Sequence, residues 1–587
     1  MNKKLTEIFQ KANQTLVNYP MILLTSFIMS ITVIYAIETN SSTDENFFHI
    51  KIIFCTSFGI SLFFALKMLS QRIGKQLLLT VIGLLFLVGY YFILPQNKDD
   101  FNEVYAFIII PTYVLLHLLV AFIPYITTGN PEKKFWEYNK NLFVNFALTM
   151  IFTGVLTAGV ELAVVSVDQL FSFHFDDKVY PEIFFLLAIF GSTFIFLLFN
   201  ENGLEYLEKE STYPVVLKFF TQFILIPLLF IYAVILYFYS GKILLVWDLP
   251  RGWVSYLILA YSVVGILALL LVHPLKEATT RSWVKMFSKI FYFSLIPLMV
   301  LLFTAIFTRL LQYGFTEPRY FVLLLALWLS AVVLYFVFKK ESSIKFIPVS
   351  LFLFGLFALI FPYFNTFSVA KRSQKKELEK ILITNNLLDN GKINFNKKIT
   401  DSIAKQVTDK FEFLNERFEK EYLEKFLTDS IKTKEEYKNG NFWNYSAFFS
   451  NVVPTSNEES TTYLNLNSKK TYYDVENYQY IITIPEYGTT EIKIKNDTFK
   501  IERIGNEDIF LKISLNSKET VDLTPLVKAI FKKYNKASGD IDVNDLFVKS
   551  SLGNYEFRIS FNSLNKSNYS ERDEYNFNEG LLLIKEK

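Results

Sequence analysis

Three polar side chains lie inside long apolar stretches of the sequence, where they could take part in proton or cation transfer. Glu161 is the one acid well inside such a stretch, His117 is the one histidine, and Asn145 lies on the same stretch as Glu161. Ionisable groups are costly in hydrocarbon, so those that occur there often belong to a proton or ion pathway. The sequence therefore predicts a candidate intramembrane polar site of Glu161, His117 and Asn145.

A structural role is the alternative for these residues, and the spacing favours it. Steps of four place a row of polar side chains on one helix face: Asn145, Thr149, Thr153, Thr157 and Glu161. Polar side chains on such a face hydrogen-bond to neighbouring helices. In this interpretation Glu161 is protonated or paired. A relay would require the helices that carry His117 and Glu161 to be neighbours.

A second group of candidates lies in or beside the loops between apolar stretches: Asp248, Arg251, Arg309, Thr316, Glu317 and Arg319. The topology expected from the charge distribution places all six on the outer face, the side that bears a C-terminal soluble domain. They could form the mouth of a site, or a docking surface, beneath that domain. The simpler alternative is that the arginines anchor helix ends at the membrane interface.

Several kinds of catalytic and metal chemistry have no support in the sequence. Cys55 is the only cysteine, so no intramolecular disulfide and no cysteine zinc cluster can form. Residues 365–587 contain no histidine and no GxSxG, HExxH, Walker or GxGxxG pattern. We therefore expect no metal and no cofactor, and we favour a protein that is not an enzyme.

The elements that must position these residues are membrane helices, because the composition divides the chain in two. Residues 1–364 are 13% ionisable, with 25 Lys+Arg and 22 Asp+Glu, whereas residues 365–587 are 30% ionisable, with 34 of each. A soluble chain is about a quarter charged throughout. The first part therefore predicts a membrane body, and the neutral second part argues against nucleic-acid binding.

Eleven apolar segments approach the roughly 20 residues that a helix needs to cross a bilayer. They are 19–37, 50–68, 76–94, 105–126, 143–167, 183–199, 217–240, 253–272, 288–308, 320–338 and 345–364. No small-residue cleavage pattern follows the first segment, which predicts a retained helix and not a signal peptide. The segment 183–199 has the weakest pattern because it is short.

Positive charge orients this bundle. With a cytoplasmic N-terminal segment, residues 1–18, the inner segments hold 18 Lys and Arg and the outer loops hold 7. Basic residues collect on the cytoplasmic side, so this count predicts the N-terminus inside and the C-terminal domain outside. A basic run just after the last span argues the other way: Lys371, Arg372, Lys375 and Lys376.

The tail carries two helical patterns and then strands. Apolar residues recur at steps of three or four in 368–388 and in about 400–430, which predicts an amphipathic helical segment over 365–435. Beyond Asn441 the period becomes two, most clearly in Tyr555, Phe557, Ile559 and Phe561, with a helix near 526–534. The predicted fold class is a polytopic α-helical membrane protein, with about eleven transmembrane helices over 19–364 and a C-terminal soluble α+β domain over 436–587.

Three stretches resemble an uncharacterised bacterial multi-pass membrane family, the "domain of unknown function 4153" family. FPYFNTFSVAKRSQ at 361–374 is similar to its membrane-exit signature, YGFTEPRY at 313–320 to its loop before the penultimate helix, and WDLPRGWV at 247–254 to its Trp/Pro-Gly-Trp loop. The family often has Gly where this chain has Phe361. The resemblance covers the membrane body and the first helices of the tail, and it implies membership without any activity, ligand or catalytic residue.

From these patterns we expect a transporter-like or envelope-associated permease body, in a bacterial cytoplasmic (inner) membrane, whose outer soluble domain gates it or recruits a partner. The expected partners are membrane lipids and an envelope protein held by the C-terminal domain, and not nucleic acid. Two alternatives stay open. One is a membrane-embedded transferase acting on lipid-linked substrates at the outer face, and the other is a sensor or scaffold that binds an envelope partner.

Overall fold

The structure is a computed structural model that describes most of the chain. It covers residues 2–587 except 40–46, 127–131, 211–212, 247–252, 277–281, 340–341, 439, 441, 443–447, 454–462, 471, 473–474, 485–487, 504–510, 535–538, 569–572 and 579. The chain divides into two compact units, Met1–Val453 and Pro454–Lys587, each with hydrophobic cores of its own.

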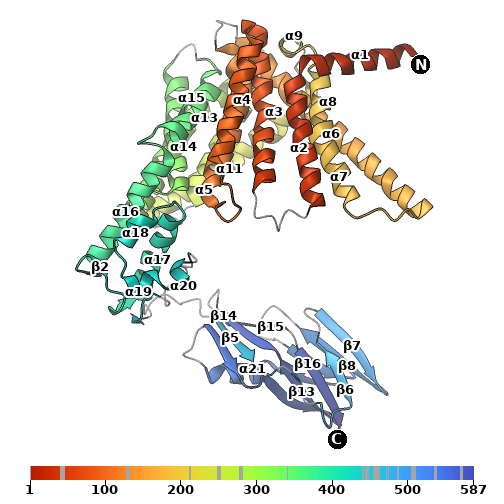
Figure 1. Ribbon diagram of the computed structural model, residues 1–587, viewed down its shortest axis with the longest axis vertical. Coiled ribbons are helices and arrows are strands. Elements are labelled where there is room, and N and C mark those ends of the chain that lie inside the picture. The colour runs from red at the N-terminus through yellow and green to blue at the C-terminus, as the bar shows by residue number, and fades with distance from the viewer. Residues whose placement is uncertain are drawn as a thin grey trace. The chain divides into compact units, whose positions relative to one another are not determined.

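Helices, most of them long, build the first part of the membrane unit (Figure 1). They are α1 (Asn2–Asn18), α2 (Pro20–Glu38), α3 (Phe48–Ile73), α4 (Gln76–Ile93), α5 (Glu103–Phe122), α6 (Glu132–Phe171), α7 (Val179–Leu186), α8 (Ser192–Phe199), α9 (Leu204–Leu207), α10 (Val215–Phe219), α11 (Ile226–Val246), α12 (Trp253–Leu271), α13 (Ser282–Tyr313), α14 (Glu317–Phe338) and α15 (Phe346–Ile360). Short 3-10 helices follow α5 (Ile123–Tyr125) and α12 (His273–Lys276). Two π-helical turns, Leu187–Gly191 and Phe220–Leu225, join α7 to α8 and α10 to α11.

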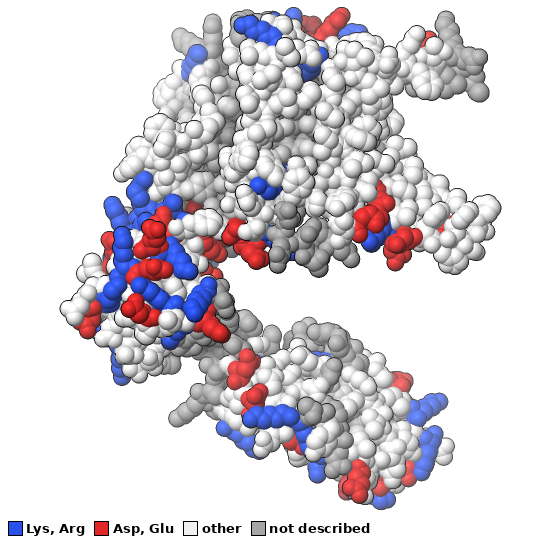
Figure 2. Space-filling model, viewed as in Figure 1, with Lys and Arg blue, Asp and Glu red and all other residues white. Residues whose placement is uncertain are grey.

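Ten of the described helical segments are long and apolar enough to cross a membrane. The π-helical turn makes Val179–Phe199 one continuous 21-residue segment, so the weakest predicted span is long enough. The last predicted span is the shorter apolar helix α15, with 15 residues. The predicted fold class is confirmed, since a mostly helical body is followed by strands in small sheets. Figure 2 shows few charged side chains over the middle of the helical body, as contact with lipid requires.

Two apolar cores hold the bundle together. One gathers fully buried side chains of α2–α6 and α8, such as Phe58, Met68 and Tyr138. The other gathers α11–α15, with Leu295 and Leu329 completely buried. Tight packing is visible at Gly83, where a Cβ would approach the Phe63 ring to 2.6 Å, so this glycine lets α3 and α4 come close.

A small helical unit follows the last membrane helix. It contains α16 (Thr366–Thr384), β1 (Leu388–Asp389), β2 (Lys392–Ile393), β3 (Ile399–Thr400), α17 (Asp401–Asn415), α18 (Lys420–Glu424), α19 (Asp429–Lys432), α20 (Glu435–Lys438) and β4 (Val452–Val453). Asn365 and Thr400 cap α16 and α17 with their side-chain oxygens. The facing apolar sides bury Leu378, Leu382 and Phe411, and Figure 2 shows dense charge of both signs over this part.

The second helical pattern of the tail is not one continuous helix. The amphipathic stretch predicted over about 400–430 includes Phe418, which continues the spacing of Phe411 and Leu414 and would therefore face the core. In the structure α17 ends at Asn415, and Phe418 is 68% exposed with a φ of +60°. The helix ends before Phe418, and the side chain of the preceding residue, Arg417, lies in a buried ion cluster with carboxylates of the membrane helices.

The second unit, Pro454–Lys587, is sheet-rich. One sheet runs β11-β5-β14-β15 (Gly539–Val543, Tyr463–Ser468, Ser563–Asn568, Asp573–Phe577), with β11 and β5 parallel. A second runs β12-β13-β16-β6 (Phe547–Leu552, Tyr555–Phe561, Gly580–Glu586, Tyr480–Thr483), and a third β10-β9-β8-β7 (Glu519–Asp522, Leu511–Leu515, Asp497–Arg503, Gly488–Ile494). The helix α21 (Thr524–Lys532) lies where one was predicted.

The alternation in the β13 sequence places large side chains in the core of the second unit. Tyr555, Phe557, Ile559 and Phe561 are all buried, while Glu556 between them is exposed. Burying each large apolar side chain contributes about 1.5–3 kcal/mol. The period-two pattern therefore identified both the strand and its inner face.

Candidate functional site

The polar face of α6 is buried against neighbouring helices. Asn145, Thr149, Thr153 and Thr157 are its buried residues within the apolar stretch. The amide of Asn145 donates to Asn200 Oδ1 at 2.9 Å, and the hydroxyl of Tyr19 donates to the Asn200 carbonyl at 2.6 Å. Asn145 therefore contributes to a polar contact that joins α6 to the end of α8 and to the start of α2.

His117 lies in a hollow of about 420 Å³ between α2, α3, α5, α6 and α8. Its polar lining also includes Ser61, Thr149, Ser192 and Thr193, and the remaining walls are apolar. His117 Nδ1 lies 2.8 Å from the carbonyl of Tyr113, which can only accept, so Nδ1 carries the proton of this bond. The other ring nitrogen, Nε2, is left to accept a proton or a hydrogen bond from a molecule in the hollow.

The structure does not bring Glu161 to His117. Glu161 follows Thr149 by 12 residues, about 18 Å of helix rise, and it does not line the hollow that holds His117. Its Oε1 is buried without a hydrogen-bond partner among the described residues. Of the three predicted intramembrane residues, His117 and Asn145 therefore belong to neighbouring polar contacts, and Glu161 stands apart.

The predicted loop residues have different environments. Asp248 and Arg251 lie outside the described residues. Thr316 precedes α14 in an extended conformation, and its carbonyl accepts from the Tyr320 amide at 2.9 Å. Arg309 and Arg319 both lie over the ring of Tyr313, at 5.8 and 5.3 Å from its centre.

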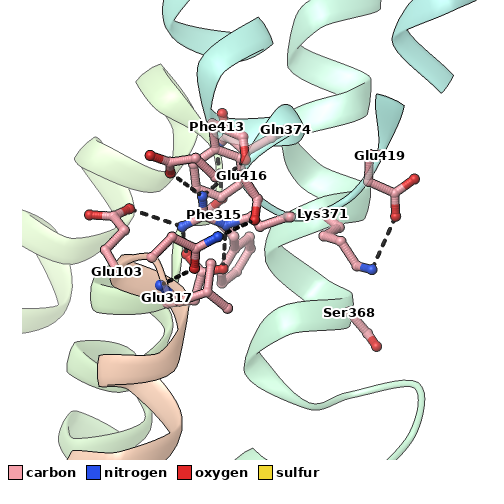
Figure 3. Close-up of polar contacts among 12 residues, drawn as sticks. Glu103, Phe315, Glu317, Ser368, Lys371, Gln374, Phe413, Glu416 and Glu419 are labelled. Atoms are coloured by element: carbon pink, nitrogen blue, oxygen red, sulfur yellow. Dashed lines mark hydrogen bonds and ion pairs between the residues drawn. The ribbon is translucent and has the colours of Figure 1, made fainter. Parts of the chain in front are cut away.

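A buried ion cluster around Arg417 was missed by the sequence analysis (Figure 3). The Arg417 side chain is 3% exposed and that of Glu317 is 0% exposed. Arg417 Nε and Nη2 each donate to one oxygen of Glu317 at 2.8 Å, which is the bidentate geometry that suits a carboxylate. Nη2 also reaches Glu103, and Nη1 reaches Glu416, both at 3.2 Å. One side chain of the helical unit thus binds the first turns of α5 and α14.

The charges of this cluster do not balance, since three carboxylates surround one guanidinium. Burial would lower the pKa of Arg417, but hydrogen bonds and charge from Glu317 and Glu103 outweigh it and raise that pKa. Burial and the negative charge of Glu103 raise the pKa of Glu416, against the opposing effect of Arg417. The guanidinium therefore stays charged, and burial next to Glu103 favours the neutral form of Glu416.

Next to this cluster, the loop Tyr313–Tyr320 is bound to the middle of α16 and to Phe364 just before it. The Ser373 hydroxyl accepts from the Phe315 amide at 2.8 Å, and the Gln374 amide donates to the Phe315 carbonyl at 2.7 Å. The Tyr320 hydroxyl donates to the Phe364 carbonyl at 2.5 Å. Two of the three family-like stretches, 313–320 and 361–374, therefore form one junction. The two family-like stretches were the sequence signal for this junction. No pattern in the sequence indicated Arg417.

We expect Gly314→Ala to destabilise the membrane unit by about 1–3 kcal/mol. Gly314 has a φ of +72°, and an added Cβ would lie 2.8 Å from Ser373 Oγ and 2.9 Å from Glu377 Cγ. Gly89→Ala is the control, because a Cβ there meets nothing within 4 Å. Thermal unfolding of the purified protein in detergent checks both variants. Equal stability of the two would contradict a close approach at Gly314.

Comparison with known proteins connects this junction to a family. A family model described as "Domain of unknown function (DUF4153)" matches residues 25–393, a range that contains both 313–320 and 361–374 but ends before Arg417. "Uncharacterized protein PM1469" of Pasteurella multocida (strain Pm70) is 27% identical over 323 residues, which is 54% of this chain and 53% of the relative. The chain thus spans about half the length of this curated relative. No solved structure matches.

Proposed function

The chain belongs to the family described as "Domain of unknown function (DUF4153)", and we propose that it is a transporter-like integral membrane protein whose solute pathway passes through the His117 hollow. A small polar solute, or a proton, is the cargo that this lining suits. The hollow is a groove among the apolar helices, open to the surface of the bundle at His117, and it offers one ionisable group and several hydroxyls. An imidazole with a free Nε2 can bind or pass a proton there.

The helix that forms one wall of the hollow supports this proposal. Ser192 and Thr193 lie directly after the π-helical turn Leu187–Gly191. A π-helical turn within an α-helix lacks regular i→i−4 bonding, and such turns occur frequently at functional sites. Here the Ser192 hydroxyl donates to the carbonyl of Ala188 at 2.6 Å, at the irregular turn itself.

The proposal includes a location. The membrane is a bacterial cytoplasmic (inner) membrane, with the N-terminus inside and the C-terminal unit outside. The 18-to-7 distribution of Lys and Arg supports this orientation, and the relative from Pasteurella multocida supports a bacterial source. Fusion of alkaline phosphatase to Lys587 tests it, because that enzyme is active only outside the cytoplasm.

Cysteine accessibility tests whether the hollow is open to water. In a Cys55→Ser background, which has no other cysteine, we expect Ser61→Cys and Ser192→Cys to react with a cationic methanethiosulfonate added from water. The reaction requires a thiolate, which forms only where water reaches the thiol. Ile151→Cys is the control, since Ile151 is 62% exposed on α6 but does not line the hollow. We expect the two hollow positions to react roughly tenfold faster or more.

Two results would contradict the proposal. If all three cysteines react equally slowly, lipid fills the hollow, and no aqueous pathway exists. If Ile151→Cys reacts as fast as the other two, the hollow is no more open to water than the lipid-facing surface of α6. A His174→Ala variant, in which the lost histidine is an exposed loop residue, serves as the matched control for His117→Ala in later flux measurements.

A sensor or scaffold is the second candidate, and the Arg417 cluster favours it. This cluster binds the helical unit to the first turns of two membrane helices with a buried ion pair, a rigid connection of the kind that a scaffold requires. In that case deletion of 454–587 abolishes function while the cysteine reactivities at Ser61 and Ser192 are unchanged. We keep the membrane-embedded transferase as a third possibility without a specific observation in its favour.

A further inference from the structure

Two arginines at the end of the bundle that bears the helical unit share one aromatic platform. Arg309 lies in the last turns of α13 and Arg319 in the first turn of α14. Both guanidinium groups lie over the ring of Tyr313, at 5.8 and 5.3 Å from its centre. A tyrosine ring attracts cations weakly, by about 0.5–1 kcal/mol at exposed sites, and this does not offset the repulsion between two like charges.

No acid of the described chain neutralises this pair. Among the described residues, no carboxylate oxygen lies within the 4.0 Å that defines an ion pair from either guanidinium. Arg319 uses Nη1 to donate to the carbonyls of Gly314, at 2.9 Å, and Tyr313, at 3.3 Å. These bonds fix the guanidinium in position and leave its other donors for a ligand.

A third cation comes from the helical unit. Lys410, on α17, lies close enough to Arg319 that burial and the positive charge of that arginine lower the Lys410 pKa. Asp409 and Glu377 act in the opposite direction on Lys410. Asp409 and Glu377 therefore offset part of the effect on Lys410, and no carboxylate of the described chain pairs with either arginine.

Arg309 and Arg319 lie at the depth in the membrane where lipid headgroups are expected. The apolar span of α13 ends at Tyr313 and that of α14 begins at Glu317. Exposed aromatic residues, which collect at membrane interfaces, follow α15 beside them: Phe361, Tyr363 and Phe364. Phe364 is linked to the same loop through the Tyr320 hydroxyl. On the face of α13 turned away from Arg309, Phe307 is 50% exposed and Leu311 is 78% exposed, as contact with acyl chains at this level requires.

We propose that Arg309 and Arg319 bind the phosphate group of an anionic membrane lipid, with Tyr313 as the platform between them and Lys410 at the edge of the site. A guanidinium presents two parallel N–H donors that match phosphate oxygens, so one phosphate can bridge two arginines and relieve their repulsion. The position of the pair at the ends of two apolar spans, at the level of exposed interfacial aromatic residues, favours a lipid over free phosphate. This site is separate from the His117 hollow and does not depend on the transport proposal.

Lipid titration of the full chain in neutral detergent, followed by native mass spectrometry, tests this site. We expect wild type to bind phosphatidylglycerol more tightly than phosphatidylcholine. Each arginine near a lipid surface contributes a factor of about five in affinity. Arg309→Gln should therefore weaken phosphatidylglycerol binding about fivefold. The double variant Arg309→Gln with Arg319→Gln should weaken it roughly 25-fold. Arg309→Gln is the safer variant, because no hydrogen bond from Arg309 to the protein is lost among the described residues.

The control is Arg372→Gln. Arg372 also lies over a tyrosine ring, 3.8 Å from the centre of Tyr363, but it is the only arginine on that ring among the described residues. We expect its lipid affinity to change less than about twofold. The proposal is overturned if Arg309→Gln binds like wild type, if Arg372→Gln loses as much as Arg309→Gln, or if inorganic phosphate displaces the lipid at an equal concentration of phosphate groups.

Discussion

Replacing Arg417 by methionine lowers the stability of the junction between the helical unit and the membrane helices by about 3–5 kcal/mol, which is the expected cost of removing one partner of a buried ion pair. Glu317 is completely buried, and its two oxygens would lose both of their 2.8 Å hydrogen bonds. The Phe413 carbonyl, which accepts from Arg417 Nη1 at 2.9 Å, would also lose its donor.

Hydrogen exchange measures this effect where it arises. The amides of α17 are expected to exchange at least about a hundredfold faster in Arg417→Met than in wild type, while those of α3 stay protected. Lys371→Ala is the control. Lys371 pairs with Glu419 at 3.0 Å, but the lysine is 35% exposed, so the expected loss is below about 1 kcal/mol.

A double variant separates charge from packing. When Glu317→Gln is added to Arg417→Met, the uncompensated buried charge disappears, and we expect most of the lost protection to return. If the double variant is as unprotected as Arg417→Met, packing against the Phe413 ring, 3.4 Å from the guanidinium carbon, is what holds the junction.

Phe557→Ala should unfold the second unit or lower its stability by about 3–5 kcal/mol, because Phe557 is 2% exposed in the middle of β13. Its strand pairs with β12 on one side and with β16 on the other. The cavity left by the ring would therefore lie under the centre of this sheet, in the core of the second unit. Ile481→Ala is the matched control, since Ile481 is 55% exposed on the edge strand β6. Its expected loss is within about 0.5 kcal/mol.

Limited proteolysis of the purified full chain distinguishes these outcomes. Phe557→Ala is expected to expose cleavage sites throughout Pro454–Lys587 while the membrane unit survives, since the two units have separate cores. Simultaneous loss of both units in this variant would show that they do not fold independently. If Ile481→Ala is cleaved as fast as Phe557→Ala, then substitution of an exposed residue on an edge strand destabilises the sheet as much as substitution of a buried one.

The sequence predicted the features that repeat along the chain. The polar face of α6 could be named from steps of four, and Asn145, Thr149, Thr153 and Thr157 are buried on it. The inner face of β13 followed from steps of two. Phe418 is the informative error, because it continues the helical pattern but lies outside after the turn at Arg417. Glu161 continues the α6 pattern as well, yet it does not meet His117.

The partition into a lipid-soluble body and a charged tail, together with the inner faces of helices and strands, was determined by the sequence itself, because burial acts on every residue and leaves a local period. Only the tertiary structure decided that Arg417 meets Glu317, 100 residues earlier, and Glu103, 314 residues earlier. It also placed two arginines over one tyrosine ring. An isolated charge has no period, and its partner depends on the path of the chain between them.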